Sequence, residues 1–174
     1  VTTEYALLHP AATRNPHNPA HTPGGSSSGS AAAVAAFMAS VAFGSQTNGS
    51  MLRPASYCGV YGIKPSFGLL PRTGLQPIAA AVDTAGLFSR DLEGLALAME
   101  AVAGPDPDDP DSLGVRASGL TEAVRNGAER HWRVAFCRTP VWHRCDADAQ
   151  TRMEAFAERL GACAEVFDLE LPAG

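Results

Sequence analysis

The chain has 174 residues, of which 45% are hydrophobic and 18% are charged, the balance of a globular domain with its own core. Its formal net charge of −5 at pH 7 argues against a basic face, so we expect neither direct nucleic-acid binding nor attachment to anionic membranes. Scattered cysteines without a C-x-x-C pair, and the absence of an H-E-x-x-H pattern, favour a reduced, cytoplasmic setting without a metal or a cofactor.

The two ends of the sequence are typical of an internal piece of a longer protein. The chain begins with Val1, shows no signal peptide, and ends soon after a strand-like run. The longest uncharged apolar run, residues 31–43, is shorter than the ~20 residues that span a bilayer.

The first segments predict a loop followed by a buried helix. Residues 9–23 contain four prolines, which indicates an extended loop. Residues 24–30 are all glycine or serine, and residues 31–43 are apolar and uncharged, the pattern of a helix buried on all sides. A glycine-rich loop that opens onto such a helix indicates a structured site rather than a flexible linker.

A second small-residue segment follows at residues 45–50. Its Asn48-Gly49 pair favours a tight turn with positive φ. Apolar residues interrupted by glycines over residues 57–64 then predict a turn of helix and a short strand.

Residues 89–103 predict a longer helix. Ser89 can cap its start, Asp91 is favourable in the first turn, and Gly104-Pro105 ends it. One face of this helix is apolar and is expected to pack inward: Leu92, Leu95, Met99 and Val102.

Residues 105–131 form a polar stretch that we interpret as a solvated connector. Four aspartates cluster in it, but the calcium-loop pattern D-x-[DN]-x-[DN]-G with a distal glutamate is absent. The aspartates are Asp106, Asp108, Asp109 and Asp111.

The last part of the chain alternates strands and a helix. Residues 133–137 predict a buried strand, and residues 146–160 predict an amphipathic helix that Gly161 ends. Phe167, Leu169 and Leu171 alternate with acidic residues, which is the period of a strand. The inward positions of the helix are Met153, Phe156, Ala157 and Leu160. The alternation of strands with helices predicts an α/β fold.

The two small-residue loops suit serine chemistry. A serine hydroxyl is a poor nucleophile until a base removes its proton, and the attacked carbonyl oxygen needs hydrogen-bond donors. A glycine-containing turn that ends in Ser50 offers such backbone donors. The loop over residues 24–30 supplies further hydroxyls, and both loops reach one site if residues 41–44 return the chain.

Several linked motifs in this order resemble the amidase-signature hydrolases. Residues 24–65 read, in sequence, as G-G-S-S-S-G from Gly24, G-S-Q-T-N-G-S from Gly44, R-P-A from Arg53, C-G from Cys58 and G-I-K-P from Gly62. The resemblance continues more weakly through residues 83–86, Asp-Thr-Ala-Gly. It implies one partial amidase-signature domain over residues 1–174, with a mixed sheet core flanked by helices, a signature core at 24–65 and the connector at 105–131.

The resemblance also implies a Ser–Ser–Lys triad that hydrolyses a carbon–nitrogen bond through an acyl-enzyme. Ser50 is then the nucleophile, and Ser26, held by a cis peptide bond, passes its proton to a lysine. Backbone N–H groups of the turn form the oxyanion hole, and neighbouring side chains support it. These residues are Thr47, Asn48 and Gly49 for the oxyanion hole and Ser27 and Gln46 for support.

Three features depart from the family pattern. The family's lysine lies N-terminal to the first serine loop, so it should precede Val1, and Lys64, the only lysine here, is expected to be structural. We therefore expect the isolated piece to be inactive. Gln46 stands where many members have aspartate, and Arg53 follows Ser50 by three positions rather than two.

The primary hypothesis is an amidase that acts on a small-molecule amide, and a homodimer is one candidate for its assembly. An alternative is the amidase component of a tRNA-dependent glutamine amidotransferase, which Gln46 and Asn48 disfavour. Another is a non-catalytic remnant. A third is an α/β-hydrolase with its nucleophile elbow at Ser27, which requires a strand directly before residues 25–29.

Overall fold

The structure is a computed structural model that describes residues 12–112, 114, 117–127 and 131–171. The chain divides into two compact units, Val1–Gly127 and Ala128–Gly174. The division falls near the end of the segment predicted as a connector. Each unit is described by itself.

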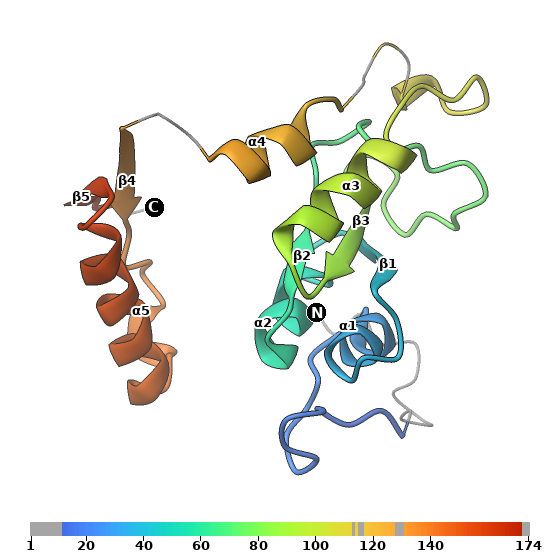
Figure 1. The fold of residues 1–174 in the computed structure, drawn as a ribbon. Coiled ribbons are helices and arrows are strands. Elements are labelled where there is room, and N and C mark those ends of the chain that lie inside the picture. Colours follow the sequence, from blue (N-terminus) through green and yellow to red (C-terminus); the bar gives the residue numbers. More distant parts are fainter. Residues whose placement is uncertain (1–11, 113, 115–116, 128–130, 172–174) are drawn as a thin grey trace. The chain divides into compact units, whose positions relative to one another are not determined.

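The first unit contains a three-stranded antiparallel sheet with the strand order β1-β3-β2 (Figure 1). β1 (Val41–Gln46) pairs with β3 (Thr84–Ser89) from Val41↔Ser89 to Gln46↔Thr84, and β2 (Tyr61–Ile63) pairs with the other edge of β3. The helices of this unit are α1 (Ser28–Ala35), α2 (Leu52–Cys58), α3 (Leu92–Val102) and α4 (Leu120–Asn126), with a 3₁₀ turn at Pro110–Ser112.

The central strand β3 is buried along its whole length because helices cover both of its faces. Phe88 packs with α1, α2 and Met51 in one apolar cluster. Its neighbour Leu87 packs with Leu95 and Met99 of α3 in a second cluster. Successive side chains of a strand point to opposite faces, so the two clusters lie on opposite sides of the sheet. Helices flanking a sheet confirm the predicted class.

The helix predicted over residues 31–43 is much shorter than expected. α1 ends at Ala35, Phe37 adopts a positive φ of 61°, and residues 41–46 form strand β1. Phe37 and Met38 are 78% and 80% exposed, so they are not core residues. An apolar run does not by itself distinguish a strand from a helix, and this run contains parts of both α1 and β1.

The predicted cap of the third helix was wrong by two residues. Ser89 is buried at the end of β3, and Asp91 is the N-cap of α3, with its side chain accepting from Gly94 N at 2.6 Å. The inward face is confirmed for Leu95 and Met99, whereas Leu92 is half exposed.

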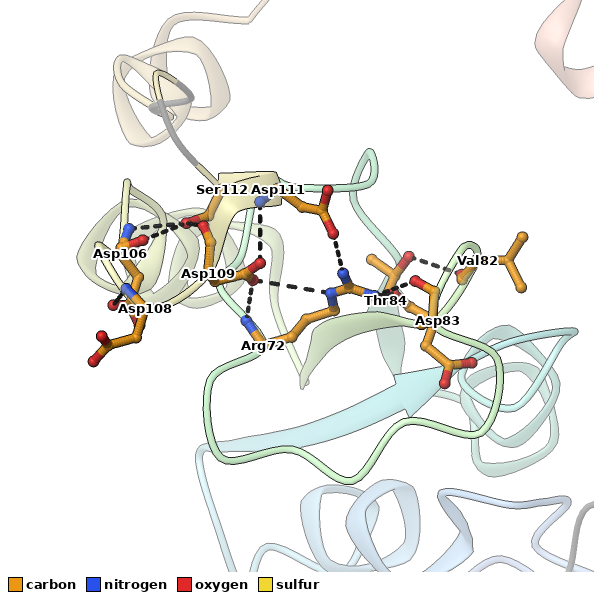
Figure 2. Close-up of polar contacts among 10 residues, drawn as sticks. Arg72, Val82, Asp83, Thr84, Asp106, Asp108, Asp109, Asp111 and Ser112 are labelled. Carbon is orange, nitrogen blue, oxygen red and sulfur yellow. Dashed lines mark hydrogen bonds and ion pairs between the residues drawn. The ribbon is translucent and has the colours of Figure 1, made fainter.

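The described residues of the segment predicted as a solvated connector include the 3₁₀ turn at Pro110–Ser112 and helix α4. Asp109 is buried and accepts a hydrogen bond from Arg72 N at 2.7 Å, and Ser112 Oγ donates to Asp109 O at 2.8 Å. Figure 2 shows Asp109 and Asp111 facing Arg72. Asp109 and Asp111 therefore bind the loop at Arg72, which is distant in sequence, and amino-acid composition alone does not indicate this contact. Among the described residues, no group of three or more His, Cys, Asp or Glu side chains is arranged to hold a metal ion.

The second unit contains a parallel pair of strands, β4 (Trp132–Phe136) and β5 (Ala164–Asp168), joined by α5 (Ala147–Leu160). A 3₁₀ turn lies at Trp142–Arg144. The predicted elements are confirmed, but β5 ends before Leu169.

The burial predicted for this unit was wrong. β4 is half exposed, and no residue of α5 is buried. Met153 and Phe156, expected to point inward, are about half exposed. Apolar side chains of both α5 and β5 therefore remain exposed, Phe156 at 50% and Phe167 at 37%.

None of the helices within the described residues has the length and apolar character that a bilayer span requires.

Candidate active site

The turn that carries Ser50 is built at the end of β1. Gln46, the last residue of β1, is buried, and its side-chain Oε1 accepts from Met51 N at 2.8 Å and Leu52 N at 3.0 Å. The amide therefore satisfies two free N–H groups at the start of α2. Gly49 adopts the predicted positive φ, 81°, and its carbonyl accepts from Arg53 N at 3.0 Å. Ser50 is held between a strand end and a helix start.

The glycine- and serine-rich loop lies directly against this turn. Ser27 N donates to Ser50 O at 3.1 Å, which joins the two serine loops through their backbones. Arg53 Nη1 donates to Gly25 O at 3.2 Å. The peptide bond between Gly25 and Ser26 is cis, as the resemblance implies. The return of the chain that this arrangement requires is made by strand β1.

Gly44 permits the close approach of the first serine loop to β1. A Cβ atom at this position would lie 2.8 Å from Ser27 Oγ and 2.7 Å from the ring of Phe88, both too close for a side chain. Ser27 Oγ also exchanges long hydrogen bonds of 3.3 and 3.4 Å with the backbone of Ser45. Ser27 is thus a bracing residue between the loops.

No strand occurs among residues 12–27, all of which the structure describes. The nucleophile-elbow alternative at Ser27 requires such a strand, so the structure contradicts it.

A cavity of about 1010 Å³ opens beside the serine loops. Ser26 and Ser27 line it, together with His21, Phe43 and Ile78. Ser50 is 4% exposed and does not belong to the lining of this cavity. Ser26 therefore lies at the cavity wall. Ser50 is joined to Ser27, the residue after Ser26, by a backbone hydrogen bond.

A second cavity, of about 420 Å³, also borders the loop at residues 75–78. Thr47, Arg72 and Asp83 line it. Thr47 Oγ1 donates to Asp83 Oδ1, which joins the first residue of the Ser50 turn to the residue before β3. The same loop is a wall of both cavities.

The other candidate residues have structural partners. Lys64 Nζ donates to Pro65 O at 2.6 Å, as expected of a structural lysine. Cys58 is fully buried, and burial raises the pKa of its thiol, which fits a packed side chain rather than a nucleophile. His17 Nε2 contacts Cys58 O at 2.9 Å, whereas His21 lines the larger cavity.

The sequence profile of the family described as Amidase matches residues 1–173. The chain belongs to the amidase family. A glutamyl-tRNA(Gln) amidotransferase subunit from Neisseria meningitidis serogroup C is 51% identical over 162 residues, which is 92% of this chain and 34% of that protein. The 1-carboxybiuret hydrolase subunit AtzE of Pseudomonas sp. strain ADP is 48% identical over 116 residues, which is 67% of this chain and 25% of that protein.

The fold is also that of solved amidase-family structures. The native peptide amidase from Stenotrophomonas maltophilia superimposes with a TM-score of 0.79 and 36% identity, covering 92% of this chain and 33% of that one. The chain thus spans about a third or less of the length of these amidase-family relatives.

Three residues near the serine loops were not singled out as site residues from the sequence. Asn15 is buried and donates to Tyr57 O at 2.8 Å, which holds the loop before Ser26 against α2. Arg53 and Asp83 bind the backbone or side chain of the serine loops directly. The motif Asp-Thr-Ala-Gly at residues 83–86 is part of the resemblance to the family. Its contact with Thr47, however, follows only from the register in which β1 pairs with β3.

Proposed function

We propose that the parent protein hydrolyses the carbon–nitrogen bond of a small-molecule amide, with Ser50 as the nucleophile and Ser26 as its proton relay. The hydrogen bond from Ser27 N to Ser50 O carries this proposal, because it brings two serine loops that are distant in sequence together beside one cavity. Membership of the amidase family supports the reaction class.

In this mechanism Ser50 Oγ attacks the amide carbonyl carbon, and its proton passes to Ser26. The resemblance assigns the base to a lysine that precedes Val1 in the parent protein. Backbone N–H groups of Thr47, Asn48 and Gly49 stabilise the negative charge on the carbonyl oxygen. The C–N bond then breaks as the leaving nitrogen takes up a proton, and water hydrolyses the Ser50 ester.

Gln46 supports this arrangement by holding the amides of Met51 and Leu52. Gln46 thus supplies an acceptor oxygen at a position where an aspartate, which also carries acceptor oxygens, is common in the family.

The second candidate is the glutamine-hydrolysing component of an amidotransferase. The observation that favours it is the 51% identity to a glutamyl-tRNA(Gln) amidotransferase subunit over 92% of this chain. In that case ammonia from L-glutamine passes to a partner protein, and the turnover of glutamine depends on that partner.

The test uses the parent protein purified with and without co-expressed partner proteins. Ammonia release is measured with L-glutamine and with a panel of simple primary amides. We expect turnover that Ser50→Ala abolishes and that Ser26→Ala reduces by about 100-fold or more. The isolated 174-residue chain serves as a control and is expected to stay inactive.

Turnover of simple amides by the protein alone supports the small-molecule amidase, and glutamine turnover that requires the partner supports the amidotransferase component. Full activity in Ser50→Ala contradicts both.

A further inference from the structure

One carboxylate joins the turn of Ser50 to the wall of the larger cavity. Thr47 directly follows β1 and Asp83 directly precedes β3, and the last opposed pair of these antiparallel strands is Gln46↔Thr84. Residues 47 and 83 are therefore the next opposed positions beyond the ladder. The hydrogen bond from Thr47 Oγ1 to Asp83 Oδ1 closes this end of the strand pair.

The second carboxylate oxygen of Asp83 holds a different segment. Asp83 Oδ2 accepts from Ile78 N at 2.5 Å and from Ala79 N at 2.8 Å. Asp83 N in turn donates to Ala79 O at 2.9 Å, so the loop is folded tightly onto this aspartate. Ile78 lines the cavity that Ser26 also lines. Each oxygen of the carboxylate therefore fixes one side of the candidate site.

Arg72 fixes the backbone that carries Asp83. Its Nη1 donates to Ala80 O at 2.5 Å and to Asp83 O at 3.2 Å, and its Nη2 binds Asp111 at 2.5 Å. Figure 2 shows Arg72 between Asp83 on one side and Asp109 and Asp111 on the other. Arg72 thus holds the backbone of Asp83, which leaves the carboxylate of Asp83 to bind Thr47 and the loop at residues 78–79.

We propose that Asp83 is a positioning residue for the reaction of Ser50, because its carboxylate holds Thr47, and with it the oxyanion turn, in register with the cavity wall at Ile78. This inference rests on the proposed function. Donors in an oxyanion hole stabilise the transition state only at the correct distance, so a small displacement of the turn is costly for the rate.

The ionisation of Asp83 is consistent with its four contacts. Burial raises the pKa of this carboxyl. The hydroxyl of Thr47, the amides of Ala79 and Ile78 and the charge of Arg72 together lower it by more, so the pKa of Asp83 lies below its ordinary value. At neutral pH both oxygens are therefore acceptors, as the hydroxyl and the two amides require.

The experiment compares steady-state kinetics of the parent protein with two variants and their combination. Thr47→Val removes the hydroxyl but keeps the shape, and we expect kcat to fall about 10- to 100-fold with KM within about threefold of wild type. Asp83→Ala also releases Ile78, so kcat should fall and KM should rise. The double variant should have no lower kcat than Asp83→Ala, because both changes remove one contact.

Two further variants separate positioning from general stability. Thr47→Ser keeps the hydroxyl and should restore kcat to within about threefold of wild type. Glu93→Gln removes the exposed ion pair between Glu93 of α3 and Arg125 of α4, outside the candidate site, and it should change neither kcat nor KM. If Asp83→Ala does not fold, the comparison of Thr47→Val with Thr47→Ser decides the question.

Labelling of Ser50 by a serine-reactive probe, measured in parallel, distinguishes the two ways to fail. Wild-type protein with neither label nor turnover overturns the proposed function and this inference together. Label and turnover at Ser50 with an unchanged kcat in Thr47→Val, or additive losses in the double variant, overturn the positioning role of Asp83 alone.

Discussion

Gln46 illustrates how a single residue links a strand to a helix at this site. It occupies a position where a carboxylate is common in the family, and the structure gives its amide oxygen two backbone donors at the start of α2. An uncharged acceptor suffices there because both donors are neutral N–H groups. The acceptor, rather than the charge, is what the position requires.

Gln46→Ala is expected to destabilise the parent protein by about 1–3 kcal/mol, because Met51 N and Leu52 N lose their acceptor in a buried setting. Denaturant unfolding of the parent protein measures this loss. The matched control is Gln46→Glu, which keeps two acceptor oxygens near a helix start and should remain close to wild type at neutral pH. An alanine variant as stable as wild type would contradict the capping role.

At the scale of single elements, one glutamate joins α3 to the start of α4. Glu100 of α3 accepts from Leu120 N and from Thr121 Oγ1, both at 2.6 Å, so it caps α4 from another helix. The hydroxyl of Thr121 is the largest influence on the pKa of Glu100; burial raises this pKa, but the backbone amides of Leu120, Thr121 and Gly119 lower it, and the net shift is downward.

A lowered pKa in the folded state makes the contact dependent on pH. Its stabilisation is fully present above the ordinary pKa of a glutamate, 4.5, and is lost as the pH falls through the lower folded pKa. The free energy of unfolding should therefore differ between wild type and Glu100→Gln at pH 7, and this difference should shrink toward pH 3. Urea unfolding across this range measures it, and a difference that stays constant with pH would refute the cap.

At the scale of the whole molecule, the sequence predicted the family better than the packing. The order of the linked motifs from Gly24 to Pro65 was enough to name the family, and the profile match over residues 1–173 confirms it. The positive φ of Gly49 was also predictable, because an Asn-Gly pair favours tight turns in which the glycine adopts a positive φ.

The errors arose where tertiary contacts decide local structure. The apolar run after Ala31 was divided between α1 and β1 by pairing with β3, which local periodicity cannot register. The aspartates after Pro105 were interpreted as solvated, yet Asp109 is buried against Arg72, which is 37 residues away in the sequence. The exposed apolar face of α5 likewise depends on surroundings that its own amphipathic pattern does not specify.

The most direct test of the central claim treats the folded parent protein with a fluorophosphonate probe and maps the modified peptide by mass spectrometry. The account predicts labelling at Ser50 that Ser50→Ala abolishes and Ser26→Ala slows, although Ser50 is only 4% exposed in the described residues. Absence of label on folded, wild-type parent protein, or label at Ser27 in place of Ser50, would contradict it.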